Sequence, residues 1–134
     1  MAVKINANTE IGSTGIKLGE IITSGSNSNG SYIKYSDGTM ICRHEFIYTT
    51  NEAFAAWGNV FDLAISLNKN FPVAFIEKPN ISINVNSGSE CIYAYVGLQN
   101  CDKTKLIAVD LMRPVATPTS SKFNISYIAI GKWK

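Results

Sequence analysis

Apolar and polar residues alternate with a period of two in several stretches of this chain, and this pattern restricts it to β structure. Ile81, Ile83 and Val85 alternate with serine and asparagine, as in a strand that buries one face and solvates the other. Helical periodicity is scarce. One short helix of at most two turns is predicted at Asn51–Trp57, capped by Thr50 or Asn51 and stopped by Gly58.

Asp37-Gly38 is the strongest turn signal, because an Asp-Gly pair between two alternating stretches is typical of a tight β-hairpin. It joins Tyr32–Ser36 to Thr39–Thr49. Further strands are predicted at Val60–Leu67, Ile81–Val85, Ile92–Leu98, Leu106–Met112 and Asn124–Lys132, with turns rich in Asn, Gly, Ser and Pro between them. Short strands separated by regular turn signals predict an all-β fold, an antiparallel β-sandwich or barrel of about six to eight strands.

The length of 134 residues fits one domain with a sizeable core. Residues 30–134 are predicted to form the sandwich. Residues 1–29 are polar and differ in kind, so we expect a connector with one weak strand at Ile16–Thr23 and a flexible loop at Gly25–Gly30. A net charge of only +2 gives no electrostatic reason to expect nucleic acid or an anionic membrane as a partner.

The three cysteines, Cys42, Cys91 and Cys101, form no Cys-x-x-Cys pair. Reduced thiols are the expectation, with a Cys91–Cys101 bridge as the alternative. No apolar stretch reaches the roughly 18 residues that span a bilayer, and no signal peptide follows Met1. We therefore expect a soluble chain that neither inserts into a membrane nor carries its own secretion signal.

Catalytic and metal-binding motifs are missing from the sequence. The single histidine, His44, shares a strand face with Met40, Cys42, Phe46 and Tyr48, which favours a core or interface histidine. No Ser-His-Asp or Cys-His set has recognisable spacing, and the acidic residues form no known carboxylate motif. One histidine and three dispersed thiols do not make a zinc site. No enzymatic activity, metal or cofactor is expected.

Aromatic side chains are the best candidates for binding, because sugars stack their apolar faces on aromatic rings. Tyr93 and Tyr95 are two residues apart on one strand and so point to the same face. The polar loop that follows adds amide, carboxylate and ammonium groups from Gln99, Asn100, Asp102 and Lys103. In the alternative, both tyrosines only pack between sheets or subunits. Tyr48 and Trp57 form a second candidate platform, while Trp133 is expected to anchor the last strand.

Three short motifs occur in order along the chain: Ser28-Asn-Gly-Ser-Tyr-Ile-Lys-Tyr-Ser-Asp-Gly-Thr-Met-Ile-Cys42, Phe71-Pro-Val-Ala-Phe75, and Ile128-Ala-Ile-Gly-Lys-Trp-Lys134. Together they resemble the C-terminal receptor-binding domains of tailed-phage and prophage tail fibres, which are similar to H-type lectins. The resemblance implies a homotrimeric β-sandwich at a fibre tip in the virion. It also implies a bacterial cell-surface ligand: wall polysaccharide, teichoic acid or lipopolysaccharide.

The sequence thus predicts a non-catalytic receptor-binding tip of a phage-type tail fibre that recognises surface carbohydrate during host adsorption. Three alternatives remain open. The chain could be a trimerisation knob that binds no ligand, a tailspike-like enzyme that degrades envelope polysaccharide, or a cellular agglutinin of the H-type lectin kind.

Overall fold

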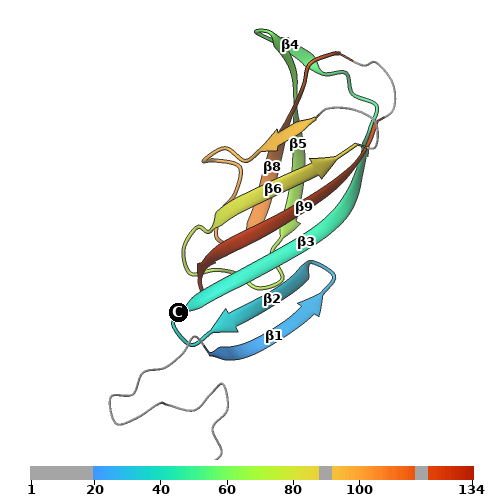
Figure 1. The fold of residues 1–134 in the computed structure, drawn as a ribbon. Helices are drawn as coiled ribbons and strands as arrows, with labels where there is room; N and C mark the ends of the chain where they lie inside the picture. Colours follow the sequence, from blue (N-terminus) through green and yellow to red (C-terminus); the bar gives the residue numbers. More distant parts are fainter. Residues whose placement is uncertain (1–19, 88–91, 117–120) are drawn as a thin grey trace, which may run out of the picture.

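The computed structural model describes residues 20–87, 92–116 and 121–134, which form two antiparallel β-sheets (Figure 1). The first sheet has the order β1-β2-β3-β9-β6, with bounds β1 Ile21–Asn27, β2 Gly30–Tyr35, β3 Thr39–Thr50, β9 Ser121–Lys132 and β6 Asn80–Asn86. The second has the order β4-β5-β8-β7, with bounds β4 Ala55–Trp57, β5 Val60–Asn70, β8 Lys105–Arg113 and β7 Tyr93–Tyr95. The predicted all-β antiparallel sandwich is therefore confirmed.

The long pair β3–β9 forms the centre of the five-stranded sheet. These strands pair without interruption from Thr39↔Lys132 to Thr50↔Ser121. The β1–β2 hairpin extends this sheet at one end of the molecule, and β4 lies at the opposite end (Figure 1). The centre of this sheet is thus built by two strands that are distant in sequence.

The predicted Asp37-Gly38 hairpin is confirmed. Gly38 has a φ of 90°, a backbone conformation that residues with a Cβ rarely adopt. The Asp37 carboxylate accepts a hydrogen bond of 2.8 Å from the Thr39 amide. Trp133 closes the same corner, because its indole Nε1 donates to the Tyr35 carbonyl at 2.9 Å and its backbone amide donates to Gly38 at 3.0 Å. Its ring packs against the core, so the predicted anchoring role of Trp133 is confirmed.

The segment predicted as a flexible loop at Gly25–Gly30 is instead a tight hairpin. Residues 25–27 belong to β1 and pair with β2, from Gly25↔Tyr32 to Asn27↔Gly30. Gly25 suits this edge strand because the Tyr32 ring covers it, with Tyr32 Oη 3.0 Å from where a Cβ would stand. Gly25, one of the residues that suggested a loop, therefore makes room for the ring of a residue on the neighbouring strand. The strand predicted at Ile16–Thr23 lies partly outside the described residues.

The predicted helix at Asn51–Trp57 is wrong. Residues 55–57 form β4, which turns back at Gly58 (φ 62°) and pairs with β5 from Ala55↔Asp62 to Trp57↔Val60. A helix of two turns is marginal in water, because its nucleation cost is spread over few hydrogen bonds. Pairing with β5 gives residues 55–57 backbone partners on a neighbouring strand instead.

The core lies between the sheets and follows the alternation read from the sequence. Met40, Cys42, Phe123, Ile125 and Ala129 point inward from the five-stranded sheet. Leu63, Ile65, Leu106, Val109 and Leu111 meet them from the four-stranded sheet. Burying these side chains supplies the main stabilisation of the fold.

The middle motif contributes two aromatic rings to this core. Phe71 and Phe75 are buried and pack edge to face, with centroids 5.2 Å apart, and Phe71 meets Tyr127 at 5.8 Å. Such edge-to-face pairs add to the energy of simple burial. The connection between β5 and β6 therefore contributes two buried rings to the core.

Cys42 and Cys101 are buried free thiols, and Cys91 lies outside the described residues. Burial raises the pKa of the Cys42 thiol to about 11, so it remains protonated and unreactive at neutral pH. The described part of the chain contains no helix that could cross a membrane.

Candidate functional site

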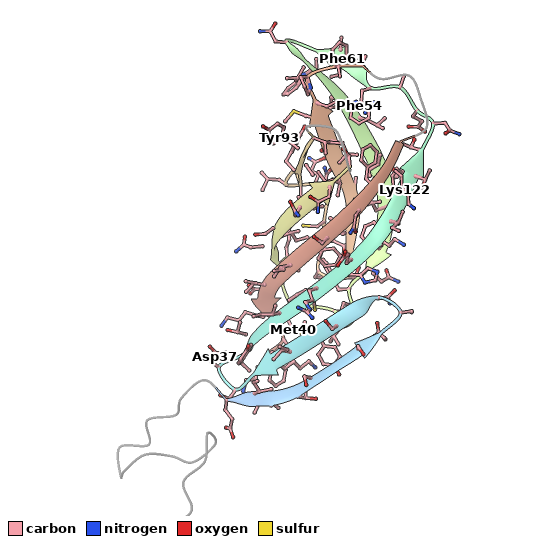
Figure 2. All side chains as sticks on the ribbon, turned by 45° about the vertical axis from the view of Figure 1, so that its right-hand side comes forward. Asp37, Met40, Phe54, Phe61, Tyr93 and Lys122 are labelled. Carbon is pink, nitrogen blue, oxygen red and sulfur yellow. The ribbon has the colours of Figure 1, made fainter. Side chains whose placement is uncertain are left out.

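Strand β7 presents Tyr93 and Tyr95 on the outer face of the four-stranded sheet. Their side chains are 63% and 40% exposed, while Ala94 between them packs toward the core. Tyr93 lies toward the end of the molecule that is far from the β1–β2 hairpin (Figure 2). The two rings share one face, as predicted, and they do not pack between the sheets.

The strand register shows which side chains stand beside the tyrosines. Tyr93 is opposite Met112 on β8, and Met112 is opposite Asp62 on β5. Tyr95 is opposite Asp110 on β8, which is in turn opposite Ala64. Because residues paired across strands point to the same side, two aromatic rings and two carboxylates share this outer face.

Asn100 adds an amide to this face. Its side-chain Nδ2 donates a hydrogen bond of 2.7 Å to Asp110 Oδ2. Its backbone carbonyl accepts from the amides of Ile107 and Ala108 at 2.8 and 3.1 Å, which holds the loop against β8. These bonds hold two hydrogen-bond acceptors in fixed positions beside Tyr95: the side-chain oxygen of Asn100 and the second carboxylate oxygen of Asp110.

The charge of Asp110 acts on Asp62, and both carboxylates act on Tyr95. Burial and then repulsion from Asp110 raise the pKa of Asp62. Burial, followed by the charges of Asp110 and Asp62, raises the pKa of the Tyr95 hydroxyl. Asp62 Oδ1 is shielded from solvent and has no hydrogen-bond partner among the described residues. We call this site the tyrosine face and define it by five residues: Tyr93, Tyr95, Asp62, Asn100 and Asp110.

Asp62 and Asp110 were not identified from the sequence. Each is the one acidic residue of its strand, and they are 48 positions apart along the chain. Only the pairing of Asp62 with Met112 and of Ala64 with Asp110 makes them diagonal neighbours. The only hint in the sequence is that each occupies an outward position of an alternating strand.

The other predicted site residues are dispersed. Gln99 and Lys103 are exposed in the loop after β7. The Asp102 carboxylate is engaged in the turn, where Oδ1 accepts from the Thr104 amide, the Thr104 hydroxyl and the Lys105 amide. It therefore shapes the loop rather than pointing toward Tyr95.

The structure does not bring Tyr48 and Trp57 together. Tyr48 lies on the inner face of β3 and packs against the core. Trp57 is 61% exposed on β4, and its pairing with Val60 places it on the same outer side as Asp62. The second platform predicted from these two residues is therefore wrong, although Trp57 extends the outer face that carries the tyrosines.

His44 packs between aromatic rings, as the strand pattern predicts. Its imidazole stacks on Phe46 at 5.5 Å and meets the edge of Tyr127 at 6.3 Å. Burial and then the Lys69 ammonium lower its pKa, so the neutral form prevails at neutral pH. Among the described residues, no group of three or more histidine, cysteine or acidic side chains is placed to hold a metal ion.

Replacing Asp62 by asparagine should stabilise the protein at neutral pH. Because the pKa of Asp62 is raised by folding, its ionisation stabilises the unfolded chain relative to the folded one. The folded state thus loses stability as the pH rises through that pKa. We expect Asp62→Asn to raise the free energy of unfolding at pH 7 by up to about 1 kcal/mol, with the gain fading below about pH 4. Urea unfolding across this pH range measures the effect.

Asp102→Asn is the matched control, and its effect on the free energy of unfolding at pH 7 should have the opposite sign. Hydrogen bonds from the Thr104 hydroxyl and amide lower the pKa of Asp102, so its stabilising effect is present at neutral pH and is lost in acid. This variant should be less stable than the parent at pH 7 and equal to it at low pH. A loss of stability in both variants at pH 7 would contradict the assigned repulsion between Asp62 and Asp110.

No family model matches the chain, and no curated protein matches it. Two solved structures do: a fragment of the P. aeruginosa R1 pyocin fibre comprising C-terminal residues 323–701, and an N-truncated R1-type pyocin tail fibre. Each shares 14% sequence identity with this chain, covers 82% of it and superposes with a TM-score of 0.51.

The matched region is 28% of the first fibre fragment and 86% of the second. The chain therefore spans much less than the whole length of the longer fragment. At this identity the likeness concerns the fold. The two-sheet sandwich described above is similar in fold to the matched parts of these pyocin fibre fragments, in agreement with the fold that the resemblance in the sequence implies.

Proposed function

We propose that this chain is the receptor-binding domain of a phage-type tail fibre, and that it binds bacterial cell-surface carbohydrate without cleaving it. The observation that carries the proposal is the pair of exposed tyrosines beside Asp110 and Asn100. The fold shared with R1 pyocin tail-fibre fragments supports the fibre role. In this role the domain would act in the virion, at the tip of the fibre.

The chemistry of the tyrosine face suits a sugar. Aromatic rings offer an apolar surface to the C–H face of a pyranose, while their hydroxyls remain in water. Asp110 and Asn100 are held together at 2.7 Å and offer acceptors to sugar hydroxyls at the edge of Tyr95. Since β8 and the loop after β7 fix these groups, little conformational entropy is lost when a ligand binds.

A homotrimer is the assembly that we propose. Several large apolar side chains that belong to neither the tyrosine face nor the core are exposed, including Ile21, Ile22 and Val115, and a subunit contact would cover such side chains. Three copies of one weak sugar site would also raise the overall affinity by avidity. Single-site binding can then be weak while attachment of the fibre remains stable.

One observation favours a second candidate function, hydrolysis of envelope polysaccharide. Asp62 and Asp110 are neighbouring carboxylates, and the raised pKa of Asp62 is a property of general acids in glycosidases. We favour binding over hydrolysis because one carboxylate is already hydrogen-bonded to Asn100 and both stand on one side of a single sheet. Release of reducing ends from host polysaccharide that is lost in Asp62→Asn would establish hydrolysis instead.

The test is binding of the fluorescently labelled chain to a panel of bacterial cells, purified wall polysaccharides, teichoic acids and lipopolysaccharides. Light scattering gives its mass in solution in the same buffer. Saturable binding to one surface type by a trimer is expected. A trimer that binds nothing across the panel would instead indicate a trimerisation knob, and a monomer would contradict the proposed assembly.

A further inference from the structure

The outer face of the five-stranded sheet holds a hollow of about 640 Å³, whereas the tyrosine face lies on the other sheet. This volume falls within the roughly 300–1,000 Å³ typical of small-molecule sites. Strands β1, β2, β3, β9 and β6 all contribute to its lining. We propose that this hollow is a second carbohydrate site, specific for a neutral, hydroxyl-rich sugar. This inference rests on the proposed function only for the class of ligand, a carbohydrate.

The register places polar side chains in two adjacent rows across the floor of the hollow. One row runs from β2 to β6 through Ser31, Arg43, Ile128 and Ser82. The next row runs through Glu45, Ser126 and Asn84. Since residues paired across strands point to the same side, hydroxyl, guanidinium, carboxylate and amide groups share this floor with one aliphatic side chain.

Arg43 and Glu45 retain capacity for a ligand. Arg43 Nε donates to Ser31 Oγ at 3.3 Å, which fixes the guanidinium and leaves its terminal nitrogens as donors, as far as the described residues show. Asn124 Nδ2 donates to Glu45 Oε1 at 2.6 Å, which fixes the carboxylate and leaves Oε2 as an acceptor. Donors and acceptors are thus already held in place within the hollow.

The tip of the β1–β2 hairpin forms one wall of the hollow, through Ser26, Asn27 and Gly30. Both polar atoms of the Asn27 side-chain amide hold this wall in place. Asn27 Nδ2 donates to the Pro72 carbonyl at 2.9 Å, and Asn27 Oδ1 accepts from the Asn29 amide at 2.8 Å. The hollow is therefore built by the fold and does not depend on ligand binding for its shape.

The balance of charge decides the class of ligand. Arg43 and Glu45 are two residues apart on the same face of β3 and are both exposed, so their charges largely cancel over the floor. A charged sugar would be attracted by one of these groups and repelled by the other, so a net charge brings it no advantage over a neutral sugar. A sugar hydroxyl both donates and accepts, so it can use either group. Ile128, which is 47% exposed, offers an aliphatic surface for the C–H face of the ring.

The test is a two-dimensional ¹H–¹⁵N spectrum of the full-length chain, titrated with methyl glucopyranoside, methyl galactopyranoside and N-acetylglucosamine. Glucuronate serves as the charged comparator. At least one neutral sugar should shift the amides of Arg43–Glu45 and Ser126–Ile128 in a saturable way. Arg43→Ala and Asn84→Ala should weaken that affinity at least about five-fold, because each removes hydrogen bonds to the ligand. Ser126→Trp should fill the hollow and abolish the response.

Ala64→Trp is the reciprocal control. Ala64 is exposed on the four-stranded sheet, where it pairs with Asp110 of the tyrosine face. This variant should block the tyrosine face and leave the sugar response of the hollow unchanged. Three results would each overturn the inference: no saturable shift with any neutral sugar, tighter binding of glucuronate, or a changed solution mass in Ser126→Trp. The last of these would mean that the face contacts another copy of the chain.

These outcomes separate the inference from the proposed function. Surface binding that depends on Tyr93 and Tyr95, with no sugar response in the hollow, would overturn the inference alone. A sugar response in the hollow without binding to any bacterial surface would contradict the proposed adsorption role and leave the second site standing.

Discussion

Gly30→Ala is expected to destabilise the protein by about 3 kcal/mol, shifting the midpoint of urea unfolding by about 2 M. Gly30 has a φ of 119°, a conformation that costs any residue with a Cβ. A Cβ there would also overlap the Arg43 carbonyl oxygen and stand 2.9 Å from His44 Cβ. Because the obstacle is the backbone of β3, no rotamer change relieves it, and the hairpin tip must move away from the sheet.

Gly58→Ala separates the two causes of this effect. Gly58 also has a positive φ, of 62°, but a Cβ there would meet nothing within 4 Å. Only the conformational cost of about 1 kcal/mol is expected for this variant. Equal losses in the two variants would show that the close approach of β2 to β3 at Gly30 contributes nothing, and would contradict the packing described for the hairpin tip.

Much of the fold could be predicted from the sequence because its strands are strongly patterned. The alternation in Ile81–Val85 and the Asp37-Gly38 turn are local signals, and the structure reproduces both. The inward face of β3, with Met40 and Cys42, also follows from alternation alone. Where local pattern and tertiary packing agree in this way, the sequence is sufficient.

The errors occurred where the local signal was weak and a tertiary contact decided the outcome. At Asn51–Trp57, short-range capping signals favoured a helix, but pairing with β5 formed β4. At Gly25, a glycine that resembles a loop residue makes room for the Tyr32 ring. In both cases the determining partner is a residue on another strand, which periodicity along one segment does not reveal.

The candidate site was predictable only in part for a similar reason. Tyr93 and Tyr95 are two residues apart, so their common face follows from strand geometry. The carboxylates beside them come from β5 and β8, and only the register of those strands brings them together. Asp102 illustrates the opposite case. It is near in sequence, but its carboxylate is used by its own turn.

The double variant Tyr93→Ala, Tyr95→Ala should weaken binding to the bacterial surface that the panel identifies by roughly 100-fold or more. Loss of each stacking ring costs a single site about ten-fold, and the loss is repeated in every copy of a multivalent fibre. Both side chains are exposed and contribute little to the core, so the fold should survive. Surface plasmon resonance on the immobilised polysaccharide measures the affinity, and circular dichroism with light scattering checks fold and mass.

Two further variants make this result specific to the rings. Tyr93→Phe, Tyr95→Phe keeps both stacking surfaces and removes only the hydroxyls, so its affinity should stay within about three-fold of the parent, because one hydrogen bond contributes little net energy. Ile76→Ala removes a similarly exposed apolar side chain between β5 and β6, away from the tyrosine face, and should leave binding unchanged. Unaltered binding by the alanine double variant, in a protein of native fold and mass, would exclude the tyrosine face as the receptor site. The hollow on the opposite sheet would then be the remaining candidate for surface recognition, since its lining contains neither tyrosine.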